Sequence, residues 1–342
     1  MKKKWNPPED WVSVETIDMH TEGEPLRIIL SGFPDLPGKT ILEKRRYYLE
    51  NHDSLRTALM WEPRGHADMY GCILVSPERG DSDIGVVFTH NEGYSTMCGH
   101  GILGVTKAVF ELGLRKGIIG KNTVKIDSPA GLITGFAEIE KEKISKVWFH
   151  NVPSYAAILD GEVKVDGLGT VRFDLAFGGA YYAYVDADEL GLELVPENKR
   201  KIIETGMAVK KAVMNGVKIE HPFEKDLSFL YGTIFTASPE TSGNHSRNVC
   251  VFADGEVDRS PTGTGVSGRA AIHYARKEIR LGEEITIESI IGSTFNVSVV
   301  KETVLGPYEA VIPKVSGRAF ITGRHTFLID PDDPLKDGFF LR

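Results

Sequence analysis

The chain carries one nine-residue pattern twice, and this doubling constrains its fold more than any other feature. The copies are TMCGHGILG, over Thr96–Gly104, and SPTGTGVSG, over Ser260–Gly268. Each copy begins with a hydroxyl residue, has Cys or Thr at its third position and ends with G-x-G-x-x-G. The copies lie about half of the 342 residues apart. A chain of this length is too long for one ordinary core, so the repeat predicts two similar domains.

A helix is predicted after each copy, because apolar residues recur there at helical spacing. Another helical pattern covers about Leu42–Trp61 and stops before Pro63. Short runs rich in β-branched and aromatic residues, such as DIGVVFTH and NVCVF, predict many strands. The apolar residues at helical spacing are Ile102, Leu103, Ala108, Val109 and Leu112 after the first copy of the repeat, and Val266, Ala270, Ile272 and Tyr274 after the second.

These elements predict an α/β (α+β) fold of two β-rich, pseudo-symmetric halves. Each half has a central helix whose start faces a shared cleft. The boundary between the halves is expected near Val147–Ser154, after the charged, hairpin-like stretch EIEKEKISKVWF.

Helix starts carry unpaired backbone N–H groups and a partial positive charge. Flanking glycines let an anion approach that backbone closely, so two such starts across a cleft can hold one carboxylate. A cysteine placed there has its pKa lowered, which predicts an activated thiolate at Cys98. Cys72 and Cys250 have apolar neighbours and are expected in the core.

Both copies also satisfy the dinucleotide fingerprint G-x-G-x-x-G, and Asp127 stands where a ribose-binding acid belongs. That fingerprint requires a strand running directly into the glycines. Polar turns precede both copies instead, HNEGYSTMC and DGEVDRSPT. The match is therefore weak evidence for a nicotinamide or flavin site.

Composition excludes several classes of protein. The net charge of −8 argues against a nucleic-acid partner. No apolar run has the length of a membrane span, and charge and proline follow the basic N-terminus, unlike in a signal peptide. Three widely spaced cysteines indicate neither a disulfide framework nor a Cys-rich metal site. We expect a cytoplasmic protein with reduced thiols and no membrane partner.

The two segments that contain the repeats resemble those of a known protein family. HNEGYSTMCGHG (His90–Gly101) and DRSPTGTG (Asp258–Gly265) resemble the two signature segments of the proline racemase family. Similar family segments recur in order over most of the chain: DMHTEGEPLR, EPRGHADMYG, DSPAGLI, FGGAYYAYVDA, NVCVFADGEVDRSP and ITGRHTFLIDPDDP.

The resemblance implies a two-domain fold of the diaminopimelate-epimerase type, free of cofactors, with its site between the domains. One domain would comprise residues 1–147 and about 325–342 and carry Cys98, while residues 148–324 would carry Thr262. The resemblance also implies a homodimer and a cyclic imino acid as substrate. No metal is expected, since His20, Glu22 and Glu24 fit no recognised ligand spacing.

In racemases of the family both copies carry a cysteine, whereas this chain has Cys98 and Thr262. A threonine hydroxyl is a poor acid–base group near neutral pH, so two-base racemisation is expected to be disabled. The Cys/Thr pair resembles the branch that dehydrates trans-3-hydroxy-L-proline to Δ1-pyrroline-2-carboxylate. Cys98 would take the α-proton, and the backbone pairs Gly99–His100 and Gly263–Thr264 would hold the carboxylate. The resemblance implies that Asp258 and His100 bind the ring nitrogen.

Two alternatives stay open at this point. A proline racemase or hydroxyproline 2-epimerase would need another acid–base group opposite Cys98. A non-catalytic binder of proline-type amino acids would not need Cys98 at all. The group that protonates the departing hydroxide is equally open among Thr262, Asp258, His100 and a water molecule.

Overall fold

Each nine-residue repeat lies at the start of a helix of 13 residues in the computed structural model, which describes residues 5–341. Helix α3 (Gly99–Glu111) begins after Cys98, and helix α5 (Gly263–Ala275) begins after Thr262. The two predicted helices are therefore confirmed. Gly113 adopts a φ of 70° just beyond α3, as expected of a glycine that ends a helix.

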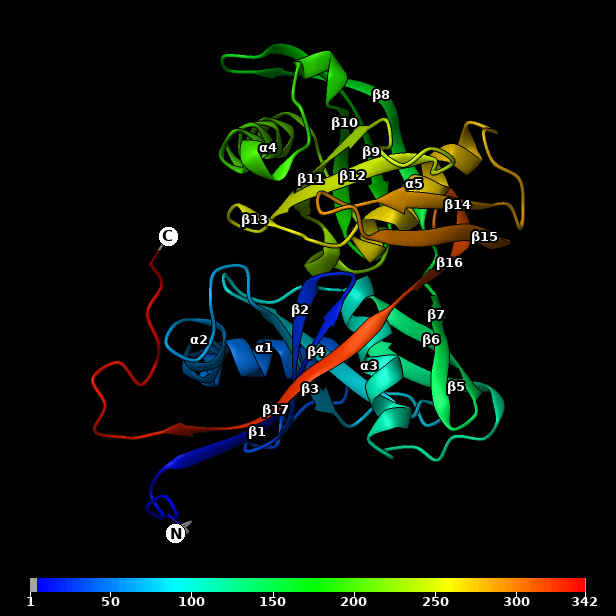
Figure 1. Ribbon diagram of the computed structural model, residues 1–342. Helices are drawn as coiled ribbons and strands as arrows, with labels where there is room; N and C mark the ends of the chain where they lie inside the picture. Colours follow the sequence, from blue (N-terminus) through cyan, green and yellow to red (C-terminus); the bar gives the residue numbers. More distant parts are fainter. Residues whose placement is uncertain (1–4, 342) are drawn as a thin grey trace.

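Figure 1 shows two lobes, one above the other. The first lobe contains β1 (Val12–Thr21), β2 (Glu24–Ser31), α1 (Ile41–Asn51), α2 (Asp53–Met60), β3 (Tyr70–Val75), β4 (Ile84–His90), α3, β5 (Gly120–Ser128), β6 (Gly131–Glu140), β7 (Lys143–His150) and β17 (Ala319–Ile329). The second contains β8 (Tyr155–Val165), β9 (Gly169–Phe177), β10 (Tyr181–Asp186), α4 (Lys199–Gly216), β11 (Leu230–Ala237), β12 (Ser246–Phe252), β13 (Glu256–Val257), α5, β14 (Glu284–Glu288), β15 (Thr294–Leu305), β16 (Tyr308–Gly317) and the short 3-10 helices Asp188–Leu190, Pro196–Asn198 and Lys225–Leu227.

Strand pairing follows one order in both lobes. From β7, the neighbours β6, β5, β4, β3, β2 and β1 pair antiparallel, antiparallel, parallel, antiparallel, parallel and antiparallel. From β16, the neighbours β15, β14, β12, β11, β10 and β9 repeat this series. β7 also pairs with β16, and this pairing joins the two series of strands in one continuous sheet. The pseudo-symmetric α/β fold predicted from the doubled pattern is confirmed.

Strands surround each of the two central helices, α3 and α5. α3 contacts β1, β2, β6, β7 and β17, whereas α5 contacts β8, β9, β10, β15 and β16. All residues of α3 are buried except Lys107, which is half-buried, and Glu111, which is exposed. A helix that is apolar on every side needs such a position, and each fully buried Leu, Ile or Val contributes roughly 1.5–3 kcal/mol. Burial of the helices thus fixes where their starts lie.

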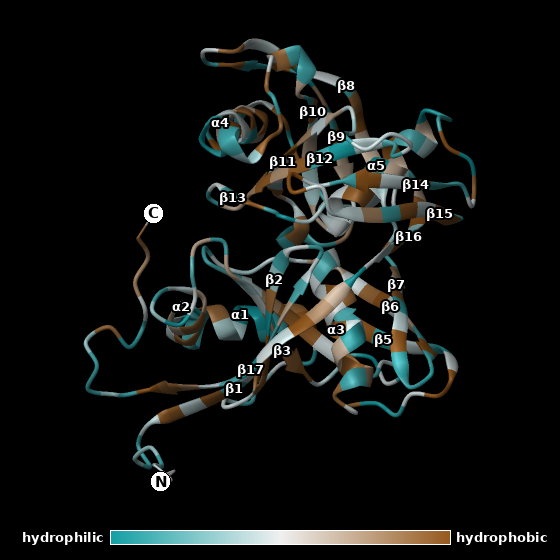
Figure 2. Ribbon diagram, viewed as in Figure 1, coloured by the Kyte–Doolittle hydropathy of each residue, from teal (hydrophilic) through white to brown (hydrophobic). Residues whose placement is uncertain are grey.

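The peripheral helices show more variation. α4 buries Ile202, Val209 and Val213 and presents polar residues outward (Figure 2). The prediction of a single helix over Leu42–Trp61 is wrong. The segment is divided into α1 and α2 at His52, whose φ of −138° and ψ of 21° are not helical. No helix within residues 5–341 has the length and apolarity needed to cross a membrane.

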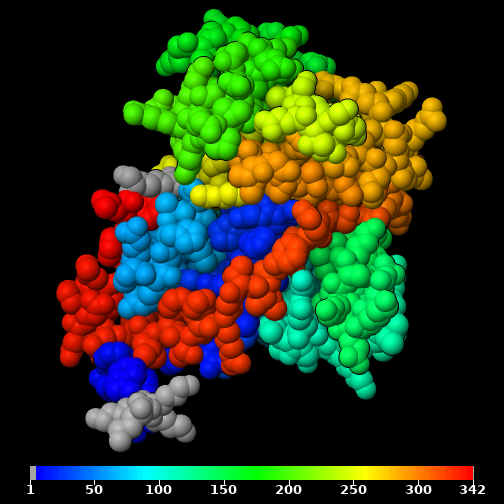
Figure 3. Space-filling view, viewed as in Figure 1, coloured from blue at the N-terminus to red at the C-terminus, as the bar shows by residue number. Residues whose placement is uncertain are grey.

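The end of the chain returns to its beginning. β16 pairs with β7, and β17 then runs antiparallel to β1 from Ala319 to Ile329. This segment forms the orange band that descends from the second lobe across the first (Figure 3). The domain bounds taken from the sequence stay a prediction.

Candidate active site

The starts of α3 and α5 meet between the lobes. A Cβ atom added to Gly99 would lie 2.4 Å from Gly263 Cα, and one added to Gly263 would lie 2.5 Å from Gly99 Cα. No residue but glycine allows this approach without moving the backbone. The unpaired N–H groups of two helix starts are thereby brought to one place, as anion binding by both helices requires.

The two residues before these helices differ in conformation as well as in chemistry. Cys98 is extended, with φ −143° and ψ 106°, and its sulfur accepts a hydrogen bond from Gly101 N–H at 3.2 Å. Thr262 has φ 67°, which strains a β-branched residue. Its hydroxyl is buried and has no hydrogen-bond partner among the described residues. The pseudo-symmetry of the fold is therefore broken at the third position of the repeat.

One small cavity, of about 20 Å3, lies at this junction. It is far smaller than the pockets that hold drug-sized ligands, so the two lobes enclose it closely. All seven residues singled out in the sequence line it, and five further residues complete the wall. The seven are Cys98, Gly99, His100, Asp258, Thr262, Gly263 and Thr264, and the five are Tyr70, Met97, Tyr182, Tyr231 and Phe252.

Cys98 is the one thiol in this wall within the described chain; Cys72 and Cys250 are fully buried in the core, as predicted. The expected lowering of the Cys98 pKa is wrong for the free protein. Burial raises the pKa of the thiol well above its usual value, although the Gly101 N–H and the Tyr70 hydroxyl lower it. The closed cavity leaves little water to solvate a thiolate, and this cost exceeds the benefit of the helix start.

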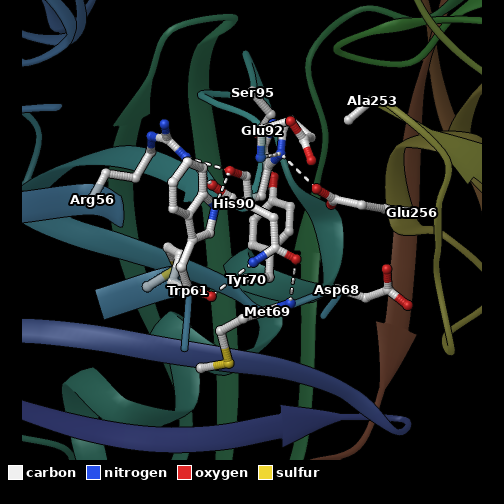
Figure 4. Close-up of polar contacts among 12 residues, drawn as sticks. Arg56, Trp61, Asp68, Met69, Tyr70, His90, Glu92, Ser95, Ala253 and Glu256 are labelled. Carbon is white, nitrogen blue, oxygen red and sulfur yellow. Dashed lines mark hydrogen bonds and ion pairs between the residues drawn. The ribbon is translucent and has the colours of Figure 1, made fainter. Parts of the chain in front are cut away.

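Tyr70 stands between Cys98 and a buried pair that joins the lobes. Its hydroxyl bonds with Ser95, and its ring stacks on His90 with centroids 5.7 Å apart (Figure 4). His90 Nδ1 lies 3.3 Å from Oε1 of Glu256, which reaches over from the second lobe. Both members of the pair are buried. Tyr70 is thus fixed at its ring and at its hydroxyl.

His100 and Asp258 add polar groups to the same wall. His100 Nδ1 lies 3.2 Å from Cys98 Sγ, and burial lowers the pKa of its imidazole, which favours the neutral ring near pH 7. Asp258 accepts a hydrogen bond from Ser260 N–H at 2.7 Å. The neighbouring Glu24 is fully buried; burial first, and then the Asp258 carboxylate, raise its pKa well above the usual value. Asp258 is the one acidic side chain among the described residues that line this cavity, so a cationic ligand would meet it there.

Sequence reasoning missed the aromatic wall. Tyr182 donates or accepts a hydrogen bond with Thr264 Oγ1 at 2.7 Å, and Tyr231 stacks on Phe252 with centroids 5.5 Å apart. Tyr70, Tyr182 and Phe252 fall in segments with family resemblance, which could have marked them. Tyr231, in FLYGTIFT, lies in a run that reads only as a buried strand.

Known proteins resemble this chain over nearly its whole length. The family model described as proline racemase matches residues 16–340. A trans-3-hydroxy-L-proline dehydratase of Colwellia psychrerythraea is 49% identical over 99% of this chain and 97% of its own. The human protein of the same name is 44% identical over 96% and 95%. The crystal structure of a hydroxyproline epimerase from Agrobacterium vitis aligns with a TM-score of 0.92 at 30% identity, over 98% of this chain and 96% of that one. The chain belongs to the proline racemase family.

Proposed function

We propose that this chain dehydrates trans-3-hydroxy-L-proline to Δ1-pyrroline-2-carboxylate without a cofactor, with Cys98 as its base. The observation that carries the proposal is the asymmetry of the cavity, where one thiol faces a threonine. The names of the Colwellia and human relatives support the same reaction. The epimerase from Agrobacterium vitis favours inversion of a hydroxyproline as the second candidate.

The cavity has a group for each charge of a cyclic imino acid. The N–H groups at the starts of α3 and α5 donate hydrogen bonds to the carboxylate, and the positive ends of both helix dipoles point toward it. Asp258 and the neutral His100 ring bind the ring nitrogen, which is a cation in the free substrate. Once this cation stands near Cys98, it lowers the pKa of the thiol and offsets part of the effect of burial.

Stereochemistry assigns both proton transfers to one side of the ring. In trans-3-hydroxy-L-proline the hydroxyl lies opposite the carboxylate and so shares a face with the α-hydrogen. The thiolate of Cys98 takes the α-proton, and the electron pair of the C–H bond forms the double bond as the C3–O bond breaks. The new thiol stands on the face of the departing oxygen and gives it that proton. Water leaves, the thiolate is restored, and the enamine tautomerises to the ketimine.

Thr262 explains why inversion does not compete. Racemisation needs a group on the opposite face that can deliver a proton to the α-carbon. Thr262 comes from the opposite lobe, but an aliphatic hydroxyl holds its proton far too strongly for that step. The electron pair of the broken C–H bond therefore expels the β-hydroxyl.

A product assay tests this function against both alternatives. The purified chain, with no cofactor added, is incubated with trans-3-hydroxy-L-proline, trans-4-hydroxy-L-proline and L-proline and followed by NMR. We expect the ketimine from the first compound only, and D-proline from none. Inversion without loss of water would favour an epimerase or racemase, and binding without turnover would favour a binder. Either outcome would overturn the proposal.

A further inference from the structure

The cavity contains two buried hydroxyls that lack a well-formed hydrogen bond within the described chain, those of Thr262 and Tyr231. The other oxygen and nitrogen groups discussed above have protein partners: Tyr70 bonds with Ser95, Tyr182 with Thr264, and Asp258 with Ser260. Tyr231 is only 6% exposed. A buried hydroxyl without a partner costs free energy, and such groups in native proteins call for a specific explanation.

The Tyr231 ring cannot turn its hydroxyl elsewhere at low cost. The ring stacks on that of Phe252. It also meets the rings of Tyr182 and His90 edge-on, and the ring centroids are 5.8 Å and 6.0 Å apart, respectively. Burial first, and then Glu256 and Cys98, raise the pKa of Tyr231 well above its usual value. A hydrogen bond that the Tyr231 oxygen accepts from Tyr70 lowers this pKa but leaves the Tyr231 proton without an acceptor. Its hydroxyl therefore keeps its proton and is held as a fixed donor.

Ring contacts connect this donor to the side of Cys98. The Tyr231 ring meets His90, His90 stacks on Tyr70, and the Tyr70 ring lies 4.7 Å from that of His100, measured between centroids. His100 Nδ1 is 3.2 Å from Cys98 Sγ, and Tyr231, Tyr70 and Cys98 line the same cavity. The α-hydrogen of the substrate must face Cys98, and the 3-hydroxyl of trans-3-hydroxy-L-proline shares that face. The unsatisfied donor and the substrate oxygen that needs a partner are thus on the same side of the ring.

We propose that Tyr231 determines specificity by donating a hydrogen bond to the 3-hydroxyl of the substrate. This inference rests on the proposed function, because the position of the hydroxyl follows from Cys98 acting as the base. The bond orients the C3–O bond beside the thiol and stabilises the oxygen as that bond breaks. A ligand without the 3-hydroxyl leaves Tyr231 unsatisfied and binds more weakly.

Tyr231→Phe is the test, with Tyr48→Phe as its matched control. Tyr48 is fully buried in a separate core cluster with Ile41, Leu59 and Met60, and its hydroxyl likewise has no described partner. Neither hydroxyl makes a well-formed hydrogen bond within the described chain, so both variants should melt close to the temperature of the unmodified chain. Only Tyr231→Phe should lower kcat/KM for trans-3-hydroxy-L-proline, by about 10- to 100-fold.

A binding measurement separates specificity from general packing. In the Cys98→Ala background, calorimetry gives Kd for trans-3-hydroxy-L-proline and for L-proline with and without Tyr231→Phe. We expect the preference for the hydroxylated ligand to fall by about 10-fold, with the Kd of L-proline unchanged. Equal weakening of both ligands, a kcat/KM within twofold of the unmodified chain, or loss of the fold would each contradict the inference. Failure of the unmodified chain to dehydrate the substrate would instead refute the proposed function.

Discussion

Cys98→Ser should reduce kcat for dehydration of trans-3-hydroxy-L-proline by at least about 10³-fold, because it removes the base while keeping nearly the same shape. A serine hydroxyl holds its proton too strongly to take one from the α-carbon. The Gly101 N–H that bonds with the sulfur can bond with the serine oxygen, so the start of α3 keeps its cap. Steady-state kinetics and thermal melting measure the two effects separately.

Cys72→Ala is the control for this substitution. Cys72 is equally buried but lies on β3 and outside the cavity wall. It should lower the free energy of unfolding by about 1 kcal/mol and leave kcat unchanged. If Cys98→Ser turned over substrate within tenfold of the unmodified chain, the assignment of Cys98 as the base would be wrong.

Gly99→Ala should have a comparable effect on activity by a different route. The new Cβ would lie 2.4 Å from Gly263 Cα and 2.7 Å from its carbonyl carbon, which are backbone atoms with no freedom to turn away. The two helix starts must separate, and their N–H groups can no longer converge on one carboxylate. We expect kcat/KM to fall by about 10³-fold, together with loss of measurable L-proline binding by calorimetry.

Gly80→Ala is the matched control, since a Cβ at Gly80 meets nothing within 4 Å. It should retain both activity and ligand binding. If Gly99→Ala bound L-proline as tightly as the unmodified chain, the carboxylate would not lie between the helix starts.

The doubled pattern predicts the fold as well as it does because it combines two independent signals. Glycines at fixed spacing mark helix starts, and the apolar stripes after Cys98 and Thr262 mark helices buried on several sides. Both signals are local in sequence, and together with the repetition they indicate two related halves. The identical order of strand pairings from β7 and from β16 is the structural counterpart of that repetition.

The features that the sequence could not predict depend on tertiary contacts. A helix start alone indicates a lowered thiol pKa at Cys98, but closure of the lobes excludes water and reverses the direction. The break at His52 interrupts a pattern that is continuous in sequence. Tyr182 and Tyr231 come from adjacent strands β10 and β11 and read as ordinary core residues until the second lobe meets the first.

Stereochemical analysis of unreacted substrate tests the single-thiol mechanism most directly. The unmodified chain is allowed to convert about half of a sample of trans-3-hydroxy-L-proline, and the remainder is resolved by chiral chromatography. We predict ketimine as the product and no cis-3-hydroxy-D-proline, the α-epimer, in the recovered substrate. Thr262→Cys restores a second thiol and supplies the variant in which the epimer is expected. Formation of the epimer by the unmodified chain would show protonation from the face opposite Cys98 and contradict the account.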